Sequence, residues 1–404
     1  MAKSKEEKLI NINYTAFQFI YWMMNSAIYS FAAVFLLYSK FNNRQIGWVL
    51  ATANFISIFL QPFLSQQIIG KLHRSIKSVV IVLTLLTILT MIPVIIFRHN
   101  HVVIFILYTL ATLINLTLQP LVNSLGFAYS EKGISINFGI SRGTGSLSYA
   151  ITSYTLGYLL ASFTPNALPV VMIVLALLFL LPLSLLPTVN EAENSLENKE
   201  SKESYSLKSI YKKYPFVLTI FLGISFLFIF HTIISTSITQ ILKQYGGDSK
   251  NVGLALLIAG LCELPAMFGF TWLMKFKPAS YWLNVSIIFF VVRSVIVLFA
   301  TNIIVIECSQ FLQAVSFALF IPASSYMMNQ ILDKKDNVLG QTVITAGMTC
   351  GGIISNIIGG YLLDLFGVFA LMSFATVCAL IGAILVFVSV RMTSKLDGAK
   401  TFLH

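Results

Sequence analysis

Long uncharged stretches follow one another along the whole chain, separated by short polar segments. Each is close to the roughly 20 apolar residues that an α-helix needs to cross a bilayer. Twelve of them are predicted, at residues 12–39, 46–69, 78–97, 102–126, 139–163, 168–187, 214–240, 252–274, 280–300, 303–327, 338–363 and 367–391. The pattern therefore predicts an all-α integral membrane protein with twelve transmembrane helices.

The order of these stretches indicates an internal duplication. We expect an N-terminal six-helix half at 1–188, a cytoplasmic linker at 189–213 and a C-terminal six-helix half at 214–404. The second and eighth stretches also begin alike, with Ile46-Gly47-Trp48 and Val252-Gly253-Leu254. Two pseudo-symmetric halves of this kind are typical of secondary transporters.

The composition argues against a soluble protein. The chain is 57% hydrophobic and 10% charged, whereas soluble domains carry about 25% charged residues. No nucleophile–base pair, metal-binding motif or phosphate loop is visible, and the four cysteines lie in apolar runs. We therefore expect no enzyme, no cofactor and no metal site, and we do not interpret the net charge of +11 as a nucleic-acid footprint.

Lysines and arginines are distributed unevenly between the predicted loops. If both termini are cytoplasmic, twenty of the 26 Lys and Arg residues fall in cytoplasmic segments and five in outer ones. Cytoplasmic loops of membrane proteins carry this excess of positive charge. We predict a multi-pass protein of the plasma-membrane lipid bilayer with cytoplasmic N- and C-termini.

Three charged residues stand out inside the predicted helices. Glu263 lies near the middle of the eighth stretch, and Arg293 and Glu307 lie at similar depths in the ninth and tenth. Such charges are costly in hydrocarbon and usually face a cavity or a partner. We predict that Glu263 carries a proton or binds solute, with a structural hydrogen bond as the alternative. Arg293 and Glu307 are interpreted as either a structural ion pair or part of the proton coupling.

Uncharged polar residues form a second group of candidates. Asn115, Gln119 and Asn123 are spaced by four residues and so share one helix face. Together with Asn25, they are predicted either to bind solute or to bond a neighbouring helix. The same alternatives apply to Tyr29, Asn54, His231, Gln240, Gln310 and Gln313. The aromatic residues Tyr21, Trp22 and Tyr149 are candidates for stacking on a sugar ring, with core packing as the alternative.

Small residues cluster in the fifth and eleventh stretches. They are Gly139, Gly143, Gly145, Ser146, Ser148, Gly347, Gly351, Gly352, Gly359 and Gly360. They indicate either close helix packing or smooth surfaces along which one half moves against the other.

Three segments resemble the oligosaccharide:proton symporter family of the major facilitator superfamily, which includes the lactose permease. They are Gln45-Ile46-Gly47 with Phe59-Leu60-Gln61-Pro62, Phe138-Gly139-Ile140-Ser141-Arg142 through Gly145, Ser146 and Tyr149, and Cys262-Glu263-Leu264 with Arg293. The resemblance is weak but covers nearly the whole chain. It implies the major facilitator fold and transport by alternating access.

The resemblance also implies roles for individual residues. Arg142 takes the place of the sugar-binding arginine, and Tyr149 that of the tryptophan that stacks on the sugar. Glu263 matches the carboxylate that joins sugar binding to protonation, and Arg293 the arginine that helps proton release. Without the resemblance, Arg142 would be assigned to the positive charge at the cytoplasmic ends of the helices.

The chain departs from the family at several positions. Asn123 and Ser124 lie where the lactose permease has a carboxylate in its fourth span. Gln310, Gln313 and Ser316 occupy the region of its span-ten His and Glu. The resemblance therefore supports the fold more strongly than the substrate.

These observations favour secondary active transport of a small polar solute, with a sugar or oligosaccharide as first candidate and protons as coupling ion. We expect a monomer. The alternatives are a nucleoside or aromatic-acid symporter, an exporter of drugs or lipids, and, with less support, a polytopic membrane enzyme.

Overall fold

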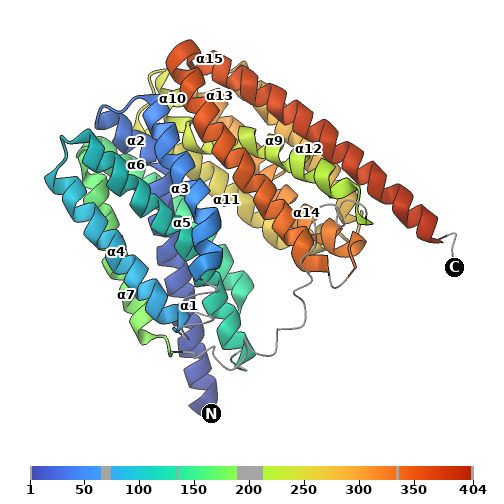
Figure 1. Ribbon diagram of the computed structural model, residues 1–404, viewed down its shortest axis with the longest axis horizontal. Helices are drawn as coiled ribbons and strands as arrows, with labels where there is room; N and C mark the ends of the chain where they lie inside the picture. Colours follow the sequence, from blue (N-terminus) through green and yellow to red (C-terminus); the bar gives the residue numbers. More distant parts are fainter. Residues whose placement is uncertain are drawn as a thin grey trace. The chain divides into compact units, whose positions relative to one another are not determined.

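A computed structural model gives the fold of the protein. It describes residues 2–64, 74–132, 134, 136–188, 213–333 and 336–401. Of the predicted linker at 189–213, residues 189–212 lie outside the described residues, and so do residues 65–73, which include the end of the second predicted stretch. All regular elements in the described residues are helices (Figure 1).

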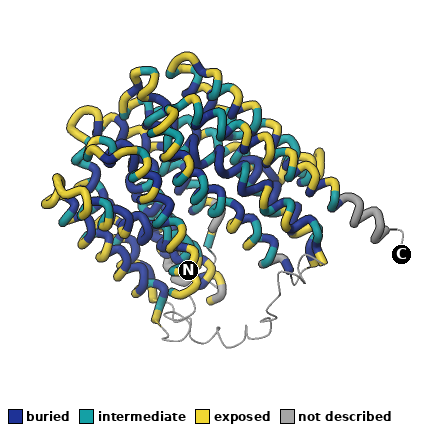
Figure 2. The backbone as a smooth tube through the Cα atoms, turned by 45° about the horizontal axis from the view of Figure 1, so that its top comes forward, coloured by how far each residue is buried: buried dark blue, intermediate teal, exposed yellow. Residues whose placement is uncertain are grey.

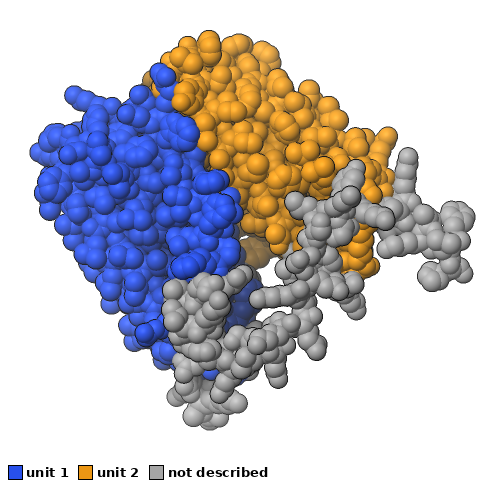
Figure 3. All heavy atoms as spheres, in the orientation of Figure 1, with its two compact units in different colours: residues 1–202 blue, residues 203–404 orange. Residues whose placement is uncertain are grey.

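The chain divides into two compact units, residues 1–202 and 203–404 (Figure 3). The first contains α1 (Ala2–Asn25), η1 (Ser26–Ser30), α2 (Ala32–Tyr38), α3 (Asn43–Phe63), α4 (Ile76–Ile96), α5 (His101–Glu131), α6 (Phe138–Ser162), η3 (Pro165–Ala167) and α7 (Leu168–Leu185). The second contains α9 (Phe216–Thr236), α10 (Ile238–Lys243), α11 (Ser249–Leu273), α12 (Ala279–Leu298), α13 (Ile303–Ser309), η5 (Gln310–Gln313), α14 (Phe317–Ile331) and α15 (Asn337–Thr401).

Nine helices in the described residues are long and apolar enough to cross a membrane, and a tenth is added if α1, η1 and α2 form one bent span. Ten spans are two fewer than the twelve predicted, and two features account for the difference. The Gly- and Ser-rich helix α6 is not among the nine, and α15 covers both the eleventh and twelfth predicted stretches. The number of membrane crossings therefore stays a prediction.

Helix α15 bends at Gly367. This residue has φ +78° and ψ −171°, while the helix continues on both sides. A side chain is strained at such a φ, and only glycine adopts it freely. The break falls at the boundary between the predicted stretches 338–363 and 367–391.

Helix α4 has apolar side chains on its exposed face and polar side chains on its buried face, as expected for a helix in a bilayer. Large apolar side chains on one face are exposed, among them Val82, Leu85 and Leu89, and the colouring of Figure 2 shows such exposed positions along the helices. Thr84 and Thr87 are buried, and each hydroxyl donates to the backbone carbonyl four residues earlier. In a protein solvated by water the polar face would be exposed, so this arrangement fits a helix that contacts lipid.

The glycines of the eleventh stretch lie against α9. A Cβ atom at Gly351 would collide with the Ser225 carbonyl oxygen, and one at Gly347 would lie 3.0 Å from Ile224 Cγ2. These positions therefore support close packing inside the second unit, one of the two interpretations given for the small residues.

The chain is anchored on both sides of residues 189–212. In the first unit, Lys77 Nζ donates to the carbonyl oxygens of Ser184 at 3.1 Å and Leu186 at 2.5 Å, and Tyr129 donates to that of Pro187 at 2.7 Å. A lysine at this position also complements the negative end of the α7 dipole.

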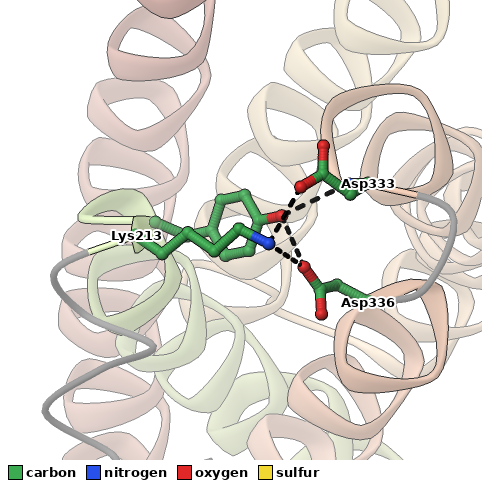
Figure 4. A network of polar contacts seen from close by, with 4 residues as sticks. Lys213, Asp333 and Asp336 are labelled. Carbon is green, nitrogen blue, oxygen red and sulfur yellow. Dashed lines mark hydrogen bonds and ion pairs between the residues drawn. The ribbon is translucent and has the colours of Figure 1, made fainter.

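In the second unit, Lys213 and Tyr214 form the other anchor (Figure 4). Lys213 Nζ pairs with Asp333 at 2.8 Å and with Asp336, and Tyr214 donates to Asp336 at 2.7 Å. The bonds to Asp333 and Asp336 raise the pKa of Lys213 above its ordinary value. This network ties the start of α9 to the loop between α14 and α15.

Candidate functional site

Polar and aromatic residues form a stripe along α1 in the first unit. Tyr14, Gln18, Trp22 and Asn25 follow one another at intervals of three or four residues and so share a helix face. Gln18 is buried, and its Nε2 donates to the Tyr14 hydroxyl at 2.9 Å and to Asn123 Oδ1 at 3.1 Å. The stripe therefore joins α1 to the polar face of α5.

Asn115, one of the predicted solute-binding residues on α5, is fully buried. Neither its side-chain oxygen nor its nitrogen has a hydrogen-bond partner among the described residues. Its backbone carbonyl accepts from the Tyr21 hydroxyl at 3.1 Å. Leaving a buried amide unpaired is costly, so a solute that supplies a donor and an acceptor would gain from binding there. Gln119 lies half-buried one turn along α5.

Arg142 on α6 lies against the ring of Trp22. Its guanidinium carbon is 4.0 Å from the ring centroid, and Nη1 donates to Ser146 Oγ at 3.0 Å. Cation–π contacts of this kind hold a guanidinium in place without using all its donors. Both Arg142 and Trp22 are half-buried.

Gly145 makes room for Trp22. A Cβ atom at this position would collide with Trp22 Cδ1 and would lie 2.9 Å from Nε1. The sequence Ser141-Arg142-Gly143-Thr144-Gly145 thus places a cation and a space for an aromatic ring one turn apart on α6.

Tyr149 lies near the same tryptophan. The two rings are edge to face, with centroids 6.5 Å apart, and the Tyr149 hydroxyl is 2.5 Å from Ser30 Oγ. The structure thus brings the predicted residues Arg142 and Tyr149 together around Trp22. Asn25 is half-buried at the end of α1, directly before the π-helical turn η1.

The second unit contains a buried arginine bonded by amides. Arg293 on α12 is 1% exposed. Its Nη1 donates to Gln313 Oε1, and its Nη2 donates to Gln310 Oε1 at 2.5 Å. Gln313 Nε2 in turn donates to Glu263 Oε1 on α11 at 3.0 Å. Four side chains from three segments thus form one network, and the Glu263 carboxylate faces the helix bundle rather than lipid.

Glu307 lies apart from this network. It accepts a hydrogen bond from Asn251 Nδ2 at 3.0 Å. No ion pair joins it to Arg293 within the described residues, so the structural ion pair considered from sequence is not formed. The reason is local: Gln310 and Gln313 are closer to the guanidinium and accept its hydrogens. A role for Glu307 in proton coupling stays a prediction.

Aromatic side chains surround His231 on α9. Its imidazole stacks on Phe317, with centroids 4.2 Å apart and planes 3° from parallel, and the Phe228 ring centroid lies 5.3 Å from that of the imidazole.

Asn54 in the first unit donates to the Tyr29 hydroxyl at 3.1 Å. This is the interhelical bond considered as an alternative for both residues.

Two residues of the first cluster, Tyr14 and Gln18, are absent from the sequence predictions. Tyr14 lies eight residues and Gln18 four residues before Trp22, and this spacing is the signal that could have identified them, because the same period selected Asn115, Gln119 and Asn123.

These features are typical of polytopic membrane proteins of the major facilitator type. The model of the MFS_1 like family matches residues 11–376, so the chain belongs to that family. Among curated proteins, none matches the chain significantly.

Solved transporters share the fold. The nucleoside transporter NupG superposes with a TM-score of 0.75 at 12% identity, covering 95% of this chain and 98% of that one. The D-xylose-proton symporter gives 0.66 at 12% identity, with 96% of each chain covered. A bacterial homolog of the human lysosomal transporter Spinster gives 0.63 at 10% identity, covering 97% and 98%. The chain is therefore a multi-pass membrane protein with the fold of these transporters.

Proposed function

We propose that this protein is a proton-coupled secondary transporter of a small polar solute, with a sugar or oligosaccharide as the first candidate, working by alternating access. The observation that carries the proposal is the network of Glu263, Gln313, Arg293 and Gln310 inside the second unit. A carboxylate and a guanidinium buried in a membrane protein are costly to retain for stability alone.

Glu263 is the proposed proton carrier. Its carboxylate accepts from Gln313 when ionised, and that amide connects it to the Arg293 guanidinium. Protonation removes the negative charge of this connected pair. If the proton binds one conformation of the transporter more tightly than the other, protonation shifts the equilibrium toward that conformation.

The cluster on α1, α5 and α6 is the proposed solute site of the first unit. Arg142, Tyr149, Asn115, Gln119, Asn123 and Asn25 supply neutral donors and acceptors and a single cation. Trp22 adds an aromatic surface that also holds Arg142. Hydroxyl-rich neutral solutes are bound by this combination of amides, one guanidinium and an aromatic ring.

A nucleoside is the second candidate, and the His231–Phe317 stack favours it. The two rings already contact each other face to face, so a planar base would stack on an outer face of this pair, beside Phe228. Thermal-shift measurement of the purified protein with D-xylose, sucrose, melibiose, uridine and adenosine separates the candidates, because a bound solute raises apparent stability. Stabilisation by nucleosides alone would reject the sugar proposal.

The coupling role is tested by Glu263→Gln, with the stabilising solute of that panel as the transported probe. We expect the variant in proteoliposomes to lose uphill accumulation driven by a proton gradient, while solute exchange at equal concentrations persists. The amide keeps the size of the carboxyl group but cannot carry the proton. Full accumulation by the variant would reject Glu263 as the proton carrier.

We further propose that the protein acts as a monomer in the plasma membrane with both termini in the cytoplasm. The excess of Lys and Arg in alternate loops supports this orientation.

A further inference from the structure

Gln313 occupies the position between the two charged groups of the second unit. Its Nε2 donates to the Glu263 carboxylate at 3.0 Å, and its Oε1 accepts from Arg293. The positive end of the amide dipole thus faces the anion, and the negative end faces the cation. Gln313 is 4% exposed, so water competes little for these bonds.

The backbone explains how Gln313 reaches both groups. Gln310–Gln313 form the 3-10 turn η5 between α13 and α14. Residues three apart in a 3-10 turn lie on the same side. Gln310 and Gln313 therefore accept hydrogen bonds from the two terminal nitrogens of Arg293 side by side. Gln313 also donates a hydrogen bond to Glu263.

The elements packed against α11 carry further ionisable groups. They are Lys243 on α10, Glu307 and Cys308 on α13 and Tyr326 on α14, and α11 itself has Cys262 next to Glu263. Arg293 on α12 is connected to Glu263 through Gln313, and His231 lies on α9. Glu307 is bonded to Asn251, His231 is stacked on Phe317, and Tyr326 lies 5.5 Å from Phe270. η5 contributes no ionisable side chain.

We propose that Gln313 is a positioning residue that transmits the charge of Glu263 to Arg293. With Glu263 ionised, the amide is held between opposite charges and fixes the guanidinium. With Glu263 protonated, one of the two charges is gone, the amide is held less tightly, and Arg293 is released to change partners. The inference rests on the proposed role of Glu263 as proton carrier, and it adds that an uncharged side chain links the proton to the arginine.

The proposal predicts how Glu263 titrates in variants of its neighbours. A hydrogen bond donated to a carboxylate favours the ionised form. Gln313→Leu removes that bond, so Glu263 should hold its proton to a pH about one unit higher. Gln310→Leu is the matched control, because it removes the other amide from the same guanidinium but leaves the bond from Gln313 to Glu263. Its midpoint should move by clearly less.

The experiment is a pH titration of the purified full chain in detergent by infrared difference spectroscopy. The carboxyl band that disappears in Glu263→Gln belongs to Glu263, and its midpoint is measured in each variant. A larger upward shift in Gln313→Leu than in Gln310→Leu supports the proposal. Equal shifts in both, or no shift in Gln313→Leu, overturn it.

A second variant covers the case in which leucine disrupts folding. Gln313→Glu keeps the size and polarity of the side chain but places a like charge beside Glu263, which should also raise the midpoint. An unchanged midpoint in this variant overturns the proposal. The outcome is distinguishable from failure of the proposed function, because uphill accumulation by Glu263→Gln rejects proton coupling whatever the infrared midpoints are.

Discussion

At the scale of single residues, Trp22 organises the first cluster. Its ring makes a cation–π contact with Arg142, lies edge to face with Tyr149 and packs against Gly145. An arginine so held loses less side-chain entropy when a solute binds, because its position is already fixed. Trp22 thus connects three residues of the segment that resembles the symporter family, Arg142, Gly145 and Tyr149.

Gly145→Ala tests this arrangement. The added methyl group must displace Trp22, so the guanidinium loses its ring contact. We expect solute affinity to fall about tenfold, which corresponds to a cation–π contribution of about 1.4 kcal/mol. Gly269→Ala is the control, because a Cβ at Gly269 meets nothing within 4 Å. Equal affinities in both variants, measured by solute-dependent thermal shift, would contradict the role assigned to Trp22.

Candidate residues were selected from the sequence where a helical period or an isolated charge marked the position. Glu263 and Arg293 were identified because charges are rare in apolar stretches, although their functional roles stay predictions. Tyr14 and Gln18 were missed because the helical period that links them to Trp22 was not followed toward the start of the first stretch. The bridge through Gln313 was not predictable, because it depends on side-chain directions in three segments far apart in the sequence.

At the scale of elements, breaks in the helices lie next to the polar clusters. The first span bends by 43° between η1 and α2, beside Ser30 and Tyr149. The tenth is interrupted at η5, beside Arg293. The sequence of η5, Gln-Phe-Leu-Gln, contains neither glycine nor proline. This break could not be predicted from composition, and bonds from the Arg293 guanidinium stabilise it instead.

The anchor at the start of α9 allows a comparison of two carboxylates bonded to one lysine. Asp336 has a side chain 1% exposed, while that of Asp333 is 51% exposed. Removing Asp336 leaves the buried Tyr214 hydroxyl without its acceptor, which is costly, whereas an exposed ion pair such as Lys213–Asp333 contributes little. We expect Asp336→Ala to lower the unfolding temperature in detergent clearly more than Asp333→Ala does.

The pH dependence of this anchor follows from the raised pKa of Lys213. The cation contributes its full stabilisation below the ordinary lysine pKa of about 10.4, and the contribution is lost only as the pH rises beyond that value toward the folded-state pKa. The stability difference between the wild type and Lys213→Met should therefore be constant from pH 6 to about 9. A difference that disappears within this interval would argue against the ion pairs.

At the scale of the whole molecule, the apolar pattern located almost every helix but not the number of crossings. The predicted stretches coincide with helices in both units, since length and hydropathy are local properties. The predicted stretch 139–163 coincides with α6, but the Gly and Ser residues of α6 leave it less apolar than the nine candidate spans. The stretches 338–363 and 367–391 lie on either side of the bend at Gly367 in α15, and the bend alone does not fix how often the chain crosses the bilayer.

Tags in two exposed loops test the topology. His99 lies between α4 and α5, and Lys277 lies between α11 and α12, with five predicted spans between them. We expect an epitope inserted at His99 to bind antibody on intact cells and one inserted at Lys277 to bind only after permeabilisation. Accessibility on the same side for both would require an even number of crossings between them and would reject the predicted arrangement.

The two anchors beside residues 189–212 have a practical consequence for measuring motion. Lys77 and Tyr129 hold the chain by hydrogen bonds up to Pro187, and the bonds of Lys213 and Tyr214 hold it at the start of α9. A label at either of these two ends therefore moves with a packed helix. Spin labels or fluorophores at Thr188 and Pro215 would thus record displacement of the helices to which these ends are bonded.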